Sequence, residues 1–113
     1  MTLTLLPVDD PKGPVETTKL PLVMGRSDVV DIRVECRWAS RKHCEIDRVG
    51  GEFVLRDLGS RNGTIVNGKS VHQIVLSPGD EISVGLKRFV VVQSNSLMNM
   101  ENESVKEFED KVV

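Results

Sequence analysis

The sequence predicts an all-β domain, a sandwich of about eleven short strands. Short apolar runs alternate with turn residues along the chain, and several runs alternate apolar and polar residues with a period of two. No interior window sustains the 3.6-residue period of a helix. A length of 113 residues suits one domain, and 39% hydrophobic with 28% charged residues is ordinary for a globular fold.

The predicted strands are short and separated by turns. In the run that contains Cys44 and Ile46, these two residues face away from Glu45 and Asp47, so one face packs on a core. Phe53 alternates in the same way with Val54. The predicted strands cover residues 3–8, 15–20, 22–25, 31–34, 43–49, 52–57, 64–66, 70–72, 74–76, 81–85 and 87–93.

The turns have specific sequence signals. Gly50-Gly51 and Asn67-Gly68 each separate two strand-like runs, and both central residues of a type I′ hairpin turn require positive φ. Pro78-Gly79-Asp80 is a turn before another strand.

The composition changes after Gln93, so we expect a domain over residues 1–93 and an acidic segment over residues 94–113. Residues 94–113 are an acidic polar tail or linker, or residues 102–113 form a short amphipathic helix. The helix would place Val105, Phe108 and Val112 on one side, and Ser104 with Glu107 fits a capping box.

Charge excludes some functions and leaves others open. The net charge of −2 argues against nucleic-acid binding by bulk charge. Residues 94–113 hold five acids and two lysines, which leaves +1 for residues 1–93. Within residues 37–42, Arg37, Arg41 and Lys42 occur without an acid, so a small anion site fits the sequence.

We expect a cytoplasmic protein with free thiols that does not bind membranes. No apolar run reaches the roughly 18 residues of a membrane helix. The first residues lack the basic character of a signal peptide. Cys36 and Cys44 are too few for a disulfide framework.

Catalysis, cofactor binding and metal binding are not expected. The sequence lacks the phosphate-loop motif GxxxxGK followed by Ser or Thr, the zinc motif HExxH, and a nucleophile–base–orienter set. Cys36, His43 and Cys44 do not form the pattern of a zinc site, which needs about four ligands.

Five motifs follow one another at characteristic spacings, and together they closely resemble the forkhead-associated (FHA) domain family over about residues 23–92. They are Gly25-Arg26, Ser40-Arg41-Lys42-His43, Ser60-Arg61-Asn62-Gly63-Thr64, Asn67-Gly68, and Gly79-Asp80 followed by Ile82 and Gly85. The resemblance implies a sandwich of two twisted sheets whose loops at one end bind phosphothreonine peptides. A phosphate dianion requires guanidinium, hydroxyl and backbone N–H donors.

The resemblance assigns ligand contacts to five residues. Arg26 matches the phosphate-binding arginine of the family, although an ion pair with Asp28 or Asp31 is the alternative. Ser40 matches the serine whose hydroxyl and backbone N–H contact phosphate, and Arg41 adds a second cation or is a solvated loop charge. Asn62 matches the asparagine that bonds the peptide backbone, and Arg61 reads the phosphate or an acidic ligand side chain.

Other residues are expected to support these loops. His43 matches a buried histidine that holds the binding loops in place. Trp38 is either part of a specificity surface or packs its loop onto the domain. Further structural support is expected from Gly25, Ser60, Gly63, Thr64, Asn67 and Gly68.

The sequence therefore predicts a non-catalytic module of signal transduction that binds phosphothreonine-containing proteins or peptides. Such a ligand implies an upstream Ser/Thr kinase, and the module is expected to belong to a larger protein or complex. The alternative is a phosphorylation-independent interaction domain that uses the same fold.

Overall fold

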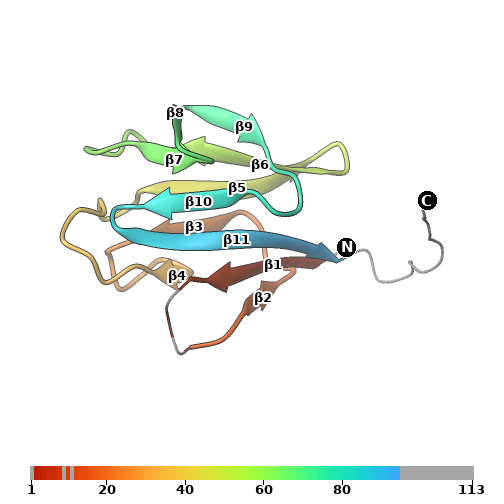
Figure 1. The fold of residues 1–113 in the computed structure, drawn as a ribbon, viewed down its shortest axis with the longest axis horizontal. Coiled ribbons are helices and arrows are strands. Elements are labelled where there is room, and N and C mark those ends of the chain that lie inside the picture. Colours follow the sequence, from red (N-terminus) through yellow and green to blue (C-terminus); the bar gives the residue numbers. More distant parts are fainter. Residues whose placement is uncertain (1, 9, 11, 95–113) are drawn as a thin grey trace.

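The computed structural model describes residues 2–8, 10 and 12–94, which form eleven strands in two sheets. The predicted sandwich is confirmed (Figure 1). One sheet has six strands in the order β2-β1-β11-β10-β7-β8, and the other has five in the order β4-β3-β5-β6-β9. The strands are β1 (Thr2–Pro7), β2 (Val15–Thr17), β3 (Leu22–Gly25), β4 (Ile32–Arg33), β5 (Cys44–Val49), β6 (Glu52–Asp57), β7 (Thr64–Val66), β8 (Lys69–Val71), β9 (Gln73–Val75), β10 (Glu81–Val84) and β11 (Lys87–Ser94).

Most strand boundaries agree with the prediction to within one residue. The exception is β2, which ends at Thr17 because the Thr17 hydroxyl accepts the N–H of Lys19 at 2.9 Å and turns the chain. At the other end of the domain, β11 continues to Ser94, one residue beyond the expected boundary. The helix considered for residues 102–113 lies outside the described residues. Within the described part of the chain, no helix is long and apolar enough to cross a membrane.

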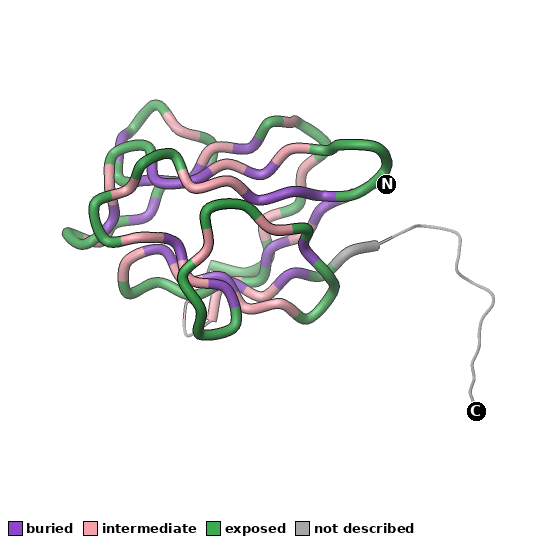
Figure 2. The backbone as a smooth tube through the Cα atoms, turned by 90° about the horizontal axis from the view of Figure 1, so that it is seen from above, coloured by how far each residue is buried: buried purple, intermediate pink, exposed green. Residues whose placement is uncertain are grey.

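The core lies between the two sheets and is built by alternation along the strands (Figure 2). Cys44 and Ile46 point inward from β5, as predicted, and each such burial stabilises the fold by about 1–3 kcal/mol. Val54 is also buried, although Phe53 and Leu55 fill the inner face, because Val54 lies between Asp47 of β5 and Val75 of β9. The core contains Leu3, Leu5, Leu22, Met24, Ile32, Val34, Phe53, Leu55, Val66, Leu76, Ile82, Val84, Phe89 and Val91.

Both predicted hairpin turns have the required backbone conformation. Asn67 and Gly68 have φ of 52° and 83°, and Gly50 and Gly51 have φ of 59° and 87°. The Asn67 amide also donates to Asp80 and accepts from the N–H of Glu81, both at 2.9 Å. These bonds fix the β7–β8 turn to the start of β10.

Strand register brings several loops to one end of the sandwich (Figure 1). The end of β3 and the end of β6 both pair with the start of β5, because Met24 and Asp57 are partners of Cys44. In the other sheet, Val84 at the end of β10 pairs with Thr64 at the start of β7. The segments 34–43, 58–63 and 85–86 meet at this end of the sandwich.

Gly25 permits the close approach of β3 to the segment before β5. A Cβ atom at Gly25 would lie 2.2 Å from the carbonyl oxygen of Arg41. We expect Gly25→Ala to lower the free energy of unfolding by about 1–3 kcal/mol, since the backbone must shift to relieve this overlap. Chemical denaturation measures the change.

The matched control is Gly13→Ala, because Gly13 has no atom within 4 Å of such a Cβ. Its effect is expected to stay within about 0.5 kcal/mol. Equal stability of the two variants would show that the Gly25 contact is not a constraint.

Candidate functional site

Backbone hydrogen bonds tie the end of β3 to the segment before β5. The N–H of Arg26 donates to the carbonyl of Ser40 at 2.9 Å, and the N–H of Ser27 donates to Arg41 at 3.1 Å. The side-chain Nε of Arg26 donates to the carbonyl of Ala39 at 3.0 Å. Arg26, Ser40 and Arg41 therefore lie side by side.

The terminal nitrogens of Arg26 have no carboxylate partner within the described part of the chain. Asp31, one of the two considered, instead pairs with Lys19 at 2.7 Å and accepts the N–H of Val23 at 2.8 Å. The Lys19 bond, helped by the Val23 N–H, lowers the pKa of Asp31 below its usual range. The Arg26 guanidinium is thus exposed, held at Nε, and available to an anion.

His43 connects two of the loops and is fully buried. Its Nδ1 accepts the N–H of Ser40 at 3.0 Å, and its Nε2 lies 2.7 Å from the carbonyl oxygen of Gly63. Because Nδ1 is an acceptor, the ring is neutral and Nε2 donates to Gly63. Both ring nitrogens are therefore used within the protein, in the supporting arrangement expected of His43.

Ser40 uses its two polar groups differently. Its hydroxyl oxygen accepts the N–H of Arg61 at 2.9 Å, so the hydroxyl hydrogen remains to donate. Its backbone N–H is directed at His43, so this group is already occupied and differs from the phosphate contact expected for it. The neighbouring N–H of Arg41 has no acceptor among the described residues.

Asp57 organises the loop between β6 and β7, although it belongs to none of the five sequence motifs. Its carboxylate accepts the N–H groups of Gly59 and Ser60 at 3.0 and 2.9 Å, the Ser60 hydroxyl, and the Thr64 hydroxyl at 2.7 Å. Burial would raise the pKa of Asp57, but these hydrogen bonds outweigh burial and lower it. An aspartate at a strand end followed by Gly and Ser is the available sequence signal.

Asn62 and Trp38 link the two loops on the outer side. The Asn62 amide nitrogen donates to the carbonyl of Trp38 at 2.8 Å, which leaves the amide oxygen without a described partner. The Trp38 side chain is 48% exposed, and the guanidinium carbon of Arg37 lies 5.3 Å from its ring centroid. Trp38 therefore borders the site with an exposed aromatic face.

A hollow of about 250 Å³ lies next to Asn62. Leu86, 74% exposed, and the exposed face of Trp38 contribute apolar surface to it. Its position beside the loops was not evident from the sequence. The lining residues are Trp38, Asn62, Gly63, Ile65, Gly85 and Leu86.

The expected site residues are brought together, with two exceptions among the supporting ones. Arg26, Arg41 and Arg61 are exposed and have no acidic partner in the described ranges, so the loops carry uncompensated positive charge. Asn67 and Gly68 lie beyond β7, where the N–H of Asn67 donates to the carbonyl of Glu81 at 2.8 Å. Among the described residues, no group of three His, Cys, Asp or Glu side chains is placed to hold a metal ion.

This arrangement brings guanidinium, hydroxyl and backbone N–H donors onto adjoining segments, and these are the donors that a phosphate dianion prefers. The sequence model of the FHA domain matches residues 22–85, which include all of these loops. The chain belongs to the FHA domain family. FHA domains are non-catalytic modules that bind phosphothreonine peptides, and the predicted function class is thereby confirmed.

Curated relatives of this FHA domain include bacterial regulators. It is 44% identical over 66 residues to the glycogen accumulation regulator GarA of Mycolicibacterium smegmatis, over 58% of this chain and 42% of GarA. It is 41% identical over 69 residues to the oxoglutarate dehydrogenase inhibitor of Corynebacterium diphtheriae, and the match covers 61% of this chain and 48% of the inhibitor. The matches span less than half of those relatives.

Solved structures show the same FHA fold. One, from a study of phosphothreonine-dependent FHA domain interactions, superposes with a TM-score of 0.77 at 30% identity, over 83% of this chain and 98% of the other. The FhaA FHA domain in complex with the intracellular domain of Rv3910 gives a TM-score of 0.73 at 31% identity, and the match covers 79% of this chain and 98% of that one.

Asp57 makes the stability of this FHA domain dependent on acid pH. The pKa of Asp57 in the folded state is below the ordinary value of 3.8. Its carboxylate therefore adds to the free energy of unfolding above pH 3.8, and this contribution is lost as the pH falls through the lowered pKa. We expect Asp57→Asn to lower the free energy of unfolding at neutral pH by about 1–3 kcal/mol. The variant should also lose part of the acid dependence in denaturation between pH 2 and 6.

Asp28→Asn is the control, because Asp28 is exposed and has no described partner. If Asp57→Asn and Asp28→Asn unfold alike at every pH, the hydrogen bonds to Asp57 do not stabilise the loop.

Proposed function

We propose that this FHA domain reads phosphothreonine in a partner protein through Arg26, Ser40 and Arg41 at the phosphate and Asn62 at the peptide backbone. The observation that carries this assignment is the Arg26 guanidinium, which is fixed by the Ala39 carbonyl and has no described acidic partner. A cation held in place without a counterion loses little entropy when it binds a dianion.

Each polar group has a separate role in this proposal. Arg26 supplies charge-assisted hydrogen bonds, the Ser40 hydroxyl donates to a phosphate oxygen, and the N–H of Arg41 adds a backbone donor. Arg61 follows Ser60 on the facing loop and adds charge to the phosphate or to an acidic ligand side chain. The Asn62 amide oxygen accepts a peptide N–H while its nitrogen stays bonded to Trp38.

The hollow beside Trp38 is proposed to bind an apolar ligand side chain that follows the phosphothreonine. Trp38, Ile65 and Leu86 supply its apolar surface, and Asn62 joins it to the peptide-binding group. The exposure of Trp38 supports recognition over simple loop packing.

The domain is further proposed to work in the cytoplasm as part of a regulatory assembly, with a Ser/Thr kinase that modifies its partner. The relatives support regulation, since they are named a glycogen accumulation regulator and an oxoglutarate dehydrogenase inhibitor. Free Cys36 and Cys44 agree with a reducing compartment. Residues 1–93 are the binding domain in this proposal, and residues 94–113 are a separate acidic segment.

Arg26→Ala is expected to weaken phosphothreonine-peptide binding by about 2–5 kcal/mol, at least about 30-fold in Kd, because the phosphate loses its fixed guanidinium. Calorimetric titration with phosphothreonine, phosphoserine and unmodified peptides measures this. The phosphoserine peptide should bind more weakly by about 1–3 kcal/mol at most, since it lacks one methyl group.

Arg48→Ala is the control for loss of one positive charge, because Arg48 is an exposed arginine at the far end of β5 without a described side-chain partner. Binding of all three peptides with equal affinity would instead indicate a phosphorylation-independent interaction domain. Normal phosphopeptide binding by Arg26→Ala would show that Arg26 does not contribute to phosphate binding.

Trp38→Ala is expected to reduce the preference for an apolar residue after the phosphothreonine by about 10-fold, while phosphate dependence remains. A positional phosphopeptide library compares the variant with the unchanged protein. The control is Val49→Ala, since Val49 is similarly exposed, at 47%, but lies in the β5–β6 hairpin. An unchanged preference in Trp38→Ala would leave Trp38 a packing residue.

A further inference from the structure

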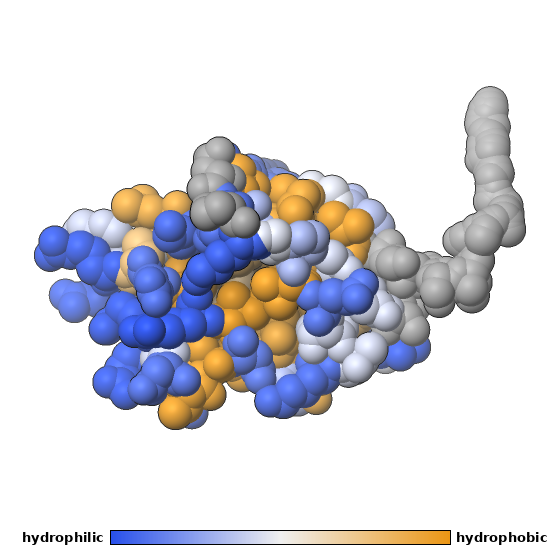
Figure 3. Space-filling view, turned by 90° about the horizontal axis from the view of Figure 1, so that it is seen from below, coloured by the Kyte–Doolittle hydropathy of each residue, from blue (hydrophilic) through white to orange (hydrophobic). Residues whose placement is uncertain are grey.

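A second concave surface, which we call the lateral groove, lies between β4 and the β1–β11 pair. It has a volume of about 270 Å³. The space-filling view shows apolar surface between hydrophilic side chains on the face that carries β1, β2 and β4 (Figure 3). The groove is lined by Pro7, Val8, Asp10, Lys12, Val15, Ile32, Arg33, Val34, Glu35, Lys87, Arg88 and Phe89.

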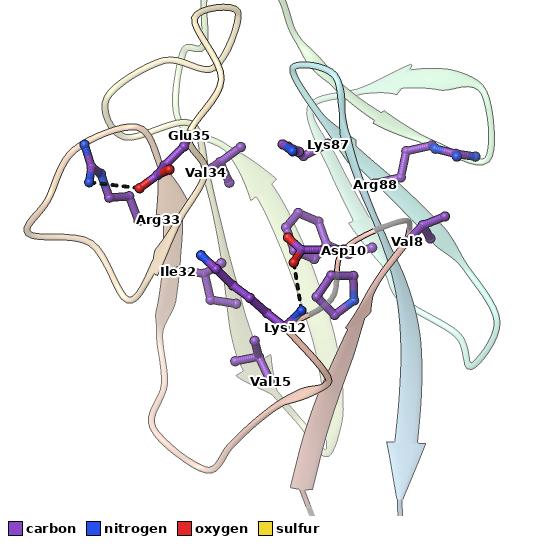
Figure 4. Close-up of a pocket in the computed structure, with 12 residues that line it drawn as sticks. Val8, Asp10, Lys12, Val15, Ile32, Arg33, Val34, Glu35, Lys87 and Arg88 are labelled. Carbon is purple, nitrogen blue, oxygen red and sulfur yellow. Dashed lines mark hydrogen bonds and ion pairs between the residues drawn. The ribbon is translucent and has the colours of Figure 1, made fainter.

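The floor and the rim of the lateral groove differ in chemistry (Figure 4). Val15, Ile32, Val34 and Phe89 contribute apolar surface and come from both sheets. The rim is polar, so the groove fits a segment that combines apolar side chains with charge.

Two ammonium groups on the rim lack acidic partners in the part of the chain that the structure describes. Arg33 forms an ion pair with Glu35 at 3.2 Å, so these two charges neutralise each other. Among the described residues, Asp10 accepts the backbone N–H of Lys12, at 2.9 Å, and no ammonium group. The side-chain ammonium groups of Lys12 and Lys87 outnumber the Asp10 carboxylate, so the rim keeps a net positive charge that an acidic occupant would neutralise.

The chain itself contains a segment of the complementary kind. Residues 95–113 carry five acids and two lysines, a net charge of −3. Val105, Phe108 and Val112 recur every three or four residues among these charges. Apolar side chains with an acidic surround match an apolar floor with a basic rim.

The segment is long enough to reach the lateral groove. Strand β11 starts at the groove with Lys87 and leads away from it to Ser94, about 23 Å along the strand. Residues 95–104 can span roughly 33–36 Å when extended, so residues from 105 onward can return to the groove. A short tether gives an effective concentration of about millimolar, so even weak docking is populated.

From the shape, charge and reach of these parts we infer that residues 105–113 dock in the lateral groove of the same molecule. Phe108 enters the apolar floor, and the neighbouring carboxylates face Lys12 and Lys87. This occupant is favoured over a separate protein because it is tethered and carries the required charge.

The docked segment would contact the strand that leads into the binding loops. Val34 donates its N–H to the carbonyl of Gly25 at 2.7 Å, beside Arg26. Two residues later, Cys36 accepts the N–H of Leu86 at 3.4 Å. Occupancy of the groove therefore braces the segment that carries Trp38 and Ser40.

NMR spectroscopy of the full chain tests the inference without any phosphopeptide. We expect nuclear Overhauser contacts between the Phe108 ring and the methyl groups of Ile32 and Val34. Phe108→Ala should remove these contacts and shift the amide resonances of Ile32, Val34 and Phe89. Unchanged resonances at the groove in Phe108→Ala would overturn the proposal.

A charge-reversal variant and a dilution series provide two further tests of this docking. Lys87→Glu is expected to weaken the contacts to Phe108, whereas Lys69→Glu is the matched control, because Lys69 is an exposed lysine on β8 outside the groove. Equal effects of the two substitutions would contradict charge pairing at the rim. Contacts that disappear on dilution would indicate docking between two copies and would overturn docking within one molecule.

Discussion

The hydrogen bonds of His43 are the interaction on which the binding end of the molecule depends. The buried imidazole joins the segment before β5, in the five-stranded sheet, to the segment before β7, in the six-stranded sheet. A buried histidine is tolerated only when its ring nitrogens have partners. The same ring therefore makes a hydrogen bond to each of two irregular loops. It fixes the two sheets relative to each other at the end where these loops lie.

Two more hydrogen bonds connect the same two loops as His43 and preorganise the site. The Ser40 hydroxyl oxygen accepts from Arg61, and the Asn62 amide donates to Trp38, so each loop holds the other. Asp57 closes the second loop onto the end of β6. Side chains held in this way lose little freedom on binding. Net charge says little about these loops, because three exposed arginines lie on adjoining segments in a chain of net charge −2.

Local patterns were sufficient to predict most of the fold. The alternation of Cys44 and Ile46 with Glu45 and Asp47 gave the buried face of β5, and Asn67-Gly68 marked a turn that requires positive φ. The ordered motifs predicted which side chains would gather at the loops. Features that arise from contacts between distant segments were not predictable: the four donors around Asp57, the occupied N–H of Ser40, the hollow beside Leu86, and the lateral groove between the sheets.

The two cysteines illustrate how one fold gives the same functional group opposite chemistry. Burial raises the pKa of Cys44 to about 12, so its thiol stays protonated near neutral pH. Burial also acts against the Cys36 thiolate, but the N–H groups of Leu86, Trp38 and Ala39 and the charge of Lys87 lower its pKa. A thiol reagent will therefore modify Cys36 first and place a spectroscopic probe beside Trp38 in the native sequence.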